Sequence, residues 1–143
     1  MFASQEEAVA AAEDVYGRYV KIADQIFVDG GEHPERLEAV ATGGYLRALL
    51  HGFARVRAEG QHSTGGTRFR DFSLQSYRPN GTTGILTAYV CEDISKVDVF
   101  DDQGDSVVSP TRPDTTIFQV AFDLGTDGNL RLSSREVWSN TKC

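Results

Sequence analysis

The sequence predicts an α+β domain in which helices pack on one face of a curved antiparallel sheet. Up to Gly60, apolar residues recur every three or four positions, which is the spacing of amphipathic helices. After Gly60 they recur at every second position and no helical pattern returns, as expected for strands. Helices followed by a run of strands are typical of the α+β class, and 143 residues is the length of one domain.

The first helix is expected to be long and to cover residues 5–27. Ser4 is a suitable N-cap, and Glu7 lies three residues later, where a capping box places its carboxylate. The helix is expected to end at the Asp29-Gly30-Gly31 segment. Its apolar stripe comprises Val9, Ala12, Val15, Tyr16, Tyr19, Ala23, Ile26 and Phe27.

Two shorter helices follow. Pro34 suits the first turn of a short second helix that carries Leu37 and Val40. Gly43-Gly44 interrupts the pattern, and a third helix then continues to Gly60. The apolar side of the third helix comprises Tyr45, Leu46, Leu49, Leu50, Phe53 and Val56.

The strand region begins with an interrupted strand over residues 67–78. Phe69 and Phe72 occupy opposite parities, so a bulge near Asp71 is needed to place both on one face. Residues 84–91 form the most apolar strand, which is therefore expected to be central.

The remaining strands are separated by recognisable turns. Residues 96–100 and 105–108 are expected to pair as a hairpin, because Asp101-Asp102-Gln103-Gly104 lies between them. Residues 115–124 alternate strictly, and a final strand runs through Leu130, Leu132 and Trp138.

The charge balance excludes two classes of partner. With 14 Lys and Arg against 21 Asp and Glu, the formal net charge is −7, which disfavours binding to nucleic acid or to anionic lipid. No uninterrupted apolar run approaches the roughly 20 residues that span a bilayer.

The two cysteines are expected to form a disulfide. Cys91 lies in the central strand, and Cys143 is the last residue, where an unpaired thiol would be exposed to oxidation. Pairing would fix the tail to the domain and stabilise it by roughly 3–4 kcal/mol. It would also indicate folding in an oxidising compartment. The alternative is two unrelated reduced cysteines in a cytosolic protein.

The sequence contains no recognisable catalytic or metal-binding motif. No two of its three histidines are spaced i, i+4, so neither a metal nor a cofactor is expected. An acidic cluster is interpreted as a solvated hairpin, because its spacing does not match a calcium loop. The cluster comprises Glu92, Asp93, Asp98, Asp101, Asp102 and Asp105.

The order of elements resembles the nuclear transport factor 2-like cone, also called the cystatin-like roll. The run Thr87–Val99, with Pro110, Trp138 and the terminal Cys143 after it, is similar to a segment of small secreted lipoproteins of actinobacteria. The resemblance implies that residues 4–143 are a single domain of this superfamily and that residues 1–3 are the remnant of a tether or an exchanged leader. It also implies an extracytoplasmic location on the outer face of the cell membrane, reached only through a lipid anchor. The resemblance implies no established activity.

Three functions are compatible with this interpretation. The first is a non-catalytic binding domain for an apolar small molecule or a surface protein. The second is a small enzyme of the ketosteroid isomerase or polyketide cyclase type, which would use Tyr16 or Tyr19 but lacks a convincing inward Asp. The third is a homodimerisation domain. For the first two functions, the expected lining of the cone is Tyr16, Tyr19, Tyr45, Phe53, Phe118 and Trp138.

Overall fold

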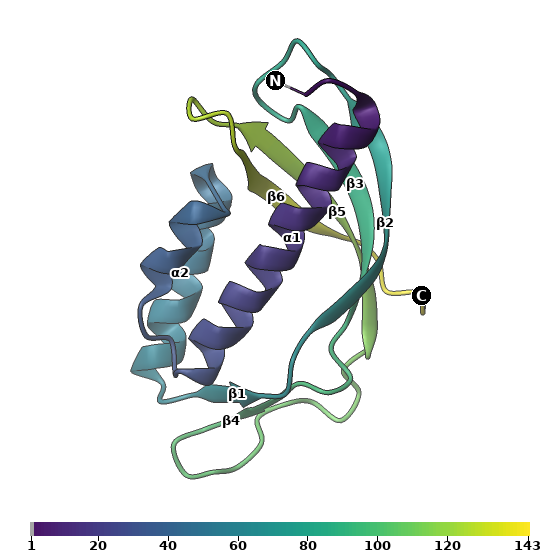
Figure 1. The fold of residues 1–143 in the computed structure, drawn as a ribbon. Coiled ribbons are helices and arrows are strands. Elements are labelled where there is room, and N and C mark those ends of the chain that lie inside the picture. Colours follow the sequence, from purple (N-terminus) through teal and green to yellow (C-terminus); the bar gives the residue numbers. More distant parts are fainter. Residues whose placement is uncertain (1) are drawn as a thin grey trace.

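The structure, a computed structural model, describes residues 2–143. Two helices, α1 and α2, lie side by side and cover one face of a curved sheet (Figure 1). The helical elements are α1 (Gln5–Val28), the 3-10 helix η1 (Pro34–Ala39) and α2 (Gly43–Ala58). The strands are β1 (His62–Thr64), β2 (Arg68–Tyr77), β3 (Leu86–Asp93), β4 (Asp98–Phe100), β5 (Thr115–Leu124) and β6 (Leu130–Ser139). The α+β prediction is confirmed.

Helix α1 begins where its capping residues predict. The Ser4 hydroxyl accepts a hydrogen bond from the Glu7 backbone N–H at 3.1 Å. The Glu7 carboxylate reaches back to the N–H of Ala3, one residue before the expected partner, at 2.9 Å. The helix ends at Val28, and the chain turns away at Gly30 and Gly31, both of which have positive φ.

Gly31 also lets the chain pass close to α2. A Cβ on Gly31 would lie 2.6 Å from the Phe53 carbonyl oxygen, which is too close for any other residue. This contact places α2 beside the end of α1, where Phe27 and Phe53 meet edge to face at 6.0 Å.

The main sheet has the strand order β2-β3-β5-β6, and all of its pairs are antiparallel. Strand β3 is therefore internal, as its apolar sequence predicts. The predicted bulge in β2 is also present: Asp71 has a φ of +58°, and the register shifts between Arg70 and Ser73. As a result Phe69 and Phe72 both pack against the core.

The predicted hairpin over residues 96–108 is present in a shorter form: the Val107 N–H donates to the Val99 carbonyl, and the Asp101 N–H donates to the Asp105 carbonyl. Strand β4 contains only Asp98–Phe100 and pairs with β1, so a separate two-stranded sheet forms at one end of the molecule (Figure 1). Ser106 makes a single bridge to Phe100. The turn is held by the Asp101 carboxylate, which accepts from the N–H groups of Gln103 and Asp105. The pairing with β1, on the other edge of β4, was not predicted, because alternation carries no information about which strands meet.

The core lies between α1, η1 and the inner face of the sheet. Tyr16, Ile26 and Leu37 from the helices are fully buried against Leu86 and Phe122 of the sheet. Among residues 2–143, no helix combines the length and apolarity needed to cross a membrane.

Candidate functional site

A buried polar cluster lies at the centre of this core. Glu92 of β3 is only 4% exposed, and the Tyr16 hydroxyl of α1 donates a hydrogen bond to its Oε2. Arg135 of β6 donates from Nε to Oε2 at 3.0 Å and from Nη2 to Oε1 at 2.7 Å. This two-point pair compensates the charge of both groups in the interior.

The interpretation of Glu92 as part of a solvated hairpin is therefore wrong. Leu86, Ala88 and Val90 face the core, and the same alternation places Glu92 on the inner face. The alternation of β3 is therefore enough to predict that Glu92 faces the core. Arg135 could not be found this way, because a register shift between β5 and β6 changes the alternation of β6 before Arg135 is reached.

The Arg135 guanidinium is held from a second side by an aromatic ring. Its central carbon lies 3.7 Å from the centroid of the Phe118 ring, a cation–π contact. Burial by itself would lower the pKa of Arg135, but the oxygens of Tyr19, Glu92 and Tyr16 outweigh it and raise that pKa. The guanidinium is therefore a permanent cation within the core.

Two further tyrosines continue the cluster toward α2. The hydroxyls of Tyr19 and Tyr45 lie 2.6 Å apart and share one hydrogen bond. Burial raises the pKa of Tyr16 and of Tyr19 well above the ordinary phenol value, and it raises that of Tyr45 as well. All three phenols are therefore neutral hydrogen-bonding groups at physiological pH.

Two cavities flank Arg135. The first, here called the α2 cavity, has a volume of about 340 Å³ and lies between α2, the end of α1 and β6. The second, the inner cavity, has a volume of about 250 Å³ and lies between α1 and the loop around Ile94. Phe27 and Arg135 line both cavities, so the two adjoin. The α2 cavity is lined by Phe27, Tyr45, Ala48, Leu49, Gly52, Phe53, Val56 and Arg135.

Most of the predicted lining residues gather around this region. Tyr16 and Tyr19 lie in the core, Tyr45 and Phe53 line the α2 cavity, and Phe118 packs under Arg135. Trp138 does not join them. It is 58% exposed and its ring lies 5.1 Å from that of Tyr89. Tyr89 alternates with the buried Ala88 and Val90, which places both rings on the outer face of the sheet.

The three histidines do not approach one another as ligands would. His33 lies in a turn with positive φ, His51 is exposed on α2, and His62 stacks on Phe100. Within residues 2–143, no group of three or more His, Cys, Asp or Glu side chains is arranged to hold a metal ion.

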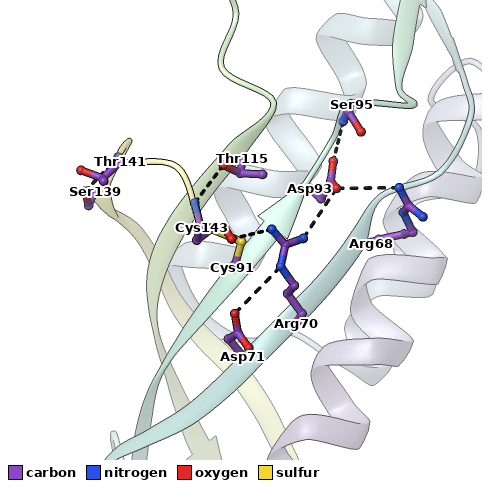
Figure 2. The surroundings of a disulfide bond; sticks show 10 residues. All are labelled: Arg68, Arg70, Asp71, Cys91, Asp93, Ser95, Thr115, Ser139, Thr141 and Cys143. Atoms are coloured by element: carbon purple, nitrogen blue, oxygen red, sulfur yellow. Dashed lines mark hydrogen bonds and ion pairs between the residues drawn. A yellow bond between two sulfur atoms is a disulfide. The ribbon is translucent and has the colours of Figure 1, made fainter.

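The predicted disulfide between Cys91 and Cys143 is present, with a Cα–Cα distance of 6.1 Å. Figure 2 shows Cys143 held on both sides: its N–H donates to the Thr115 hydroxyl, and its carbonyl accepts from Arg70 at 2.6 Å. Arg70 also lies 3.6 Å from Asp93, whose pKa is lowered chiefly by hydrogen bonds from Ser95. Such a bridge is characteristic of domains that fold in oxidising, extracytoplasmic compartments.

Comparison with known proteins identifies the fold alone. Neither a protein-family model nor a curated protein matches the sequence. Several solved structures resemble it, among them three small α+β domains with low sequence identity. The intermembrane space region of the chloroplast protein ARC6 has a TM-score of 0.65 at 17% identity, over 90% of this chain and 95% of that one. A protein from Catenulispora acidiphila has a TM-score of 0.57 at 15% identity, over 95% and 94% of the two chains. Aln2 from a Streptomyces species has a TM-score of 0.54 at 20% identity, over 96% and 93%.

Proposed function

We propose that this chain is a non-catalytic binding domain that holds an apolar small molecule in the α2 cavity, which is open to solvent at Ala48 and Gly52. The α2 cavity supports this proposal. Its walls are mostly aliphatic and aromatic, and its volume falls within the range of small-molecule sites. Arg135 and Tyr45 add polar groups to the apolar walls, which is the usual composition of such sites.

Binding is favoured over catalysis because the buried carboxylate is already occupied. A general base must lie within hydrogen-bonding reach of the proton that it removes. Glu92 instead accepts three hydrogen bonds, one from Tyr16 and two from Arg135, and it does not line the α2 cavity. An isomerase or cyclase of the ketosteroid isomerase type would need a free acid–base pair facing the ligand.

The location that we propose is extracytoplasmic, on the outer face of a cell membrane. The disulfide supports an oxidising compartment. The resemblance to nuclear transport factor 2-like domains of secreted lipoproteins supports attachment through a lipid anchor. The three similar structures, all α+β, are compatible with that superfamily. In this setting the ligand would be captured outside the cell, and a surface protein is the alternative partner.

Filling the α2 cavity from one side tests the proposed function. Gly52 lines the cavity, and a Cβ built there meets no atom within 4 Å, so Gly52→Leu can place its side chain in the space. Gly44→Leu is the matched control, on the same helix but outside the cavity. The probe is N-phenyl-1-naphthylamine, a neutral dye that fluoresces in apolar surroundings.

The expected result is saturable binding of one dye per chain to the wild type. Gly52→Leu should weaken this binding by about tenfold or more, since a filled pocket loses the buried contact area of the dye. Gly44→Leu should bind like the wild type. The proposal is wrong if the wild type does not bind the dye, or if Gly52→Leu binds it equally well.

A further inference from the structure

The polar groups of the α2 cavity also indicate what kind of head group a ligand must carry. We propose that the cavity selects a neutral apolar ligand with a carbonyl oxygen, which would accept hydrogen bonds from Tyr45 and from Nη1 of Arg135. This inference rests on the proposed function and deepens it by naming the ligand class.

One nitrogen of the Arg135 guanidinium, Nη1, is available as a hydrogen-bond donor. Two of its three nitrogens, Nε and Nη2, donate to Glu92. No acceptor within residues 2–143 takes a hydrogen bond from Nη1, although the side chain lines both cavities and is 22% exposed. A guanidinium has only donors, so its free edge can meet only an acceptor.

The tyrosine pair supplies a second donor. Two hydroxyls that share one hydrogen bond use one of their two protons, which leaves the other proton available. Tyr45 lines the α2 cavity, whereas Tyr19 lines the inner cavity. When Tyr19 donates to Tyr45, the remaining O–H belongs to Tyr45, on the side of the α2 cavity.

The side chains of the cavity provide few hydrogen-bond acceptors for a ligand that carries donors. Tyr45 and Arg135 are the only polar side chains among the eight lining residues, and the others are Gly or apolar. The cavity is lined by α2 on one side, and the carbonyls inside that helix are used in its own hydrogen bonds. A ligand alcohol or amine would therefore be poorly paired, whereas a carbonyl would meet two donors.

The charge at the site favours a neutral head group over an acid. Glu92 already balances the charge of Arg135 through two hydrogen bonds. A ligand carboxylate would add an uncompensated negative charge about one side chain away from Glu92, at a cost in a partly buried site. A ketone or an ester brings the acceptor without that cost.

A pair of probes that differ in one atom group tests this inference. The probes are 2-acetylnaphthalene and 2-isopropenylnaphthalene, in which a C=CH₂ group replaces C=O at nearly the same shape. Each displaces N-phenyl-1-naphthylamine from the wild type, from Tyr45→Phe and from Tyr89→Phe. Tyr89 is the matched control, because it lies on the outer face of the sheet. A thermal melt of each variant checks its folding.

The ratio of ketone to alkene affinity should fall by about tenfold in Tyr45→Phe, the effect of one lost hydrogen bond. It should stay unchanged in Tyr89→Phe. Independently of any variant, the C=O stretch of the bound ketone should lie at lower wavenumber than in hexane. An unchanged ratio in a folded Tyr45→Phe, or a C=O band at its hexane position, overturns the inference and leaves the binding function intact. Failure of both probes and of the dye to bind overturns the two together.

Discussion

At the scale of single residues, Glu92 and Arg135 form an ion pair inside the core. The two side chains are 5% and 22% exposed, and both hydrogen-bonding edges of the carboxylate are used. A buried pair of this kind contributes little compared with an apolar core, but the loss of one member leaves the other charge uncompensated. The two members therefore depend on each other.

Arg135→Met should lower the free energy of unfolding by about 3–5 kcal/mol, because it leaves Glu92 buried without its partner. The double variant Glu92→Leu/Arg135→Met should recover most of that loss. Arg18→Met serves as the control: Arg18 pairs with Asp14 on the exposed face of α1, and its loss should change stability by about 0.5 kcal/mol or less. Urea unfolding measures all three. A double variant no more stable than Arg135→Met would contradict this account.

Because the buried tyrosines have raised pKa values, we expect the folded protein to lose stability at alkaline pH. Burial, the largest cause, raises the pKa of Tyr16, Tyr19 and Tyr45 above the ordinary value of 10.0. Between that value and the higher folded value, the unfolded chain loses these protons while the folded chain keeps them. Stability is therefore fully present below pH 10 and falls as the pH rises above it. Tyrosinate absorbance of these residues should appear together with the loss of circular dichroism, and an earlier appearance would contradict the prediction.

The sequence was sufficient for some residues of the site and not for others. The helical spacing of Tyr16 and Tyr19 predicts that both face the core, and they do. Trp138 lies on the outer face instead of the predicted inner face, because the register shift between Ala121 and Phe122 reverses the alternation of β6 after Leu132. The partnership of Glu92 and Arg135 joins positions 43 residues apart and depends on sheet order, which periodicity does not contain.

At the scale of elements, the bulge of β2 decides which face of the strand reaches the core. Asp71 adopts a left-handed conformation there, with a φ of +58°. Asp tolerates this conformation better than most residues, and a β-branched residue tolerates it poorly. The sequence therefore indicates the bulge in two ways. The apolar positions of β2 change parity there, and Asp71 is a residue type that tolerates positive φ.

Asp71→Val should therefore destabilise the domain by about 1–2 kcal/mol. Asp71→Gly, which removes the same carboxylate but favours positive φ, should be as stable as the wild type or slightly more stable. The glycine variant also controls for the exposed pair of Asp71 with Arg70, whose groups lie 3.9 Å apart. Chemical unfolding of both variants measures the difference. Equal losses in the two variants would show that the backbone conformation is not the cause.

The predictable elements are those with local signals. The caps of α1, the parity change of β2 and the strict alternation of β5 all lie within a few residues of what they determine. The pairing of β4 with β1 brings together His62 and Phe100, and nothing near either residue in the sequence specifies that choice. The local turn predicts the partner on one edge of β4, whereas the partner on the other edge is decided only by the assembled fold.

At the scale of the whole molecule, the disulfide joins residues 52 positions apart and closes a covalent loop that contains β4, β5 and β6. Cys91→Ala/Cys143→Ala should lower the free energy of unfolding by about 3–4 kcal/mol, since the unfolded chain regains the freedom of that loop. The wild type in excess reductant should show the same loss. Guanidinium unfolding measures both, and a change below about 1 kcal/mol would mean that the hydrogen bonds from Arg70 and Thr115 hold the tail without the bridge.

The same bridge determines how the molecule would bear tension. If the two ends of the chain are pulled apart, the load reaching Cys143 passes through the sulfur atoms directly into Cys91 in the middle of the sheet. Strands β5 and β6, which carry Phe118 and Arg135, then lie outside the loaded path. In an optical trap, the oxidised chain should extend by about 180 Å less than the reduced chain, at the length of an extended residue for each of the 52 positions bypassed.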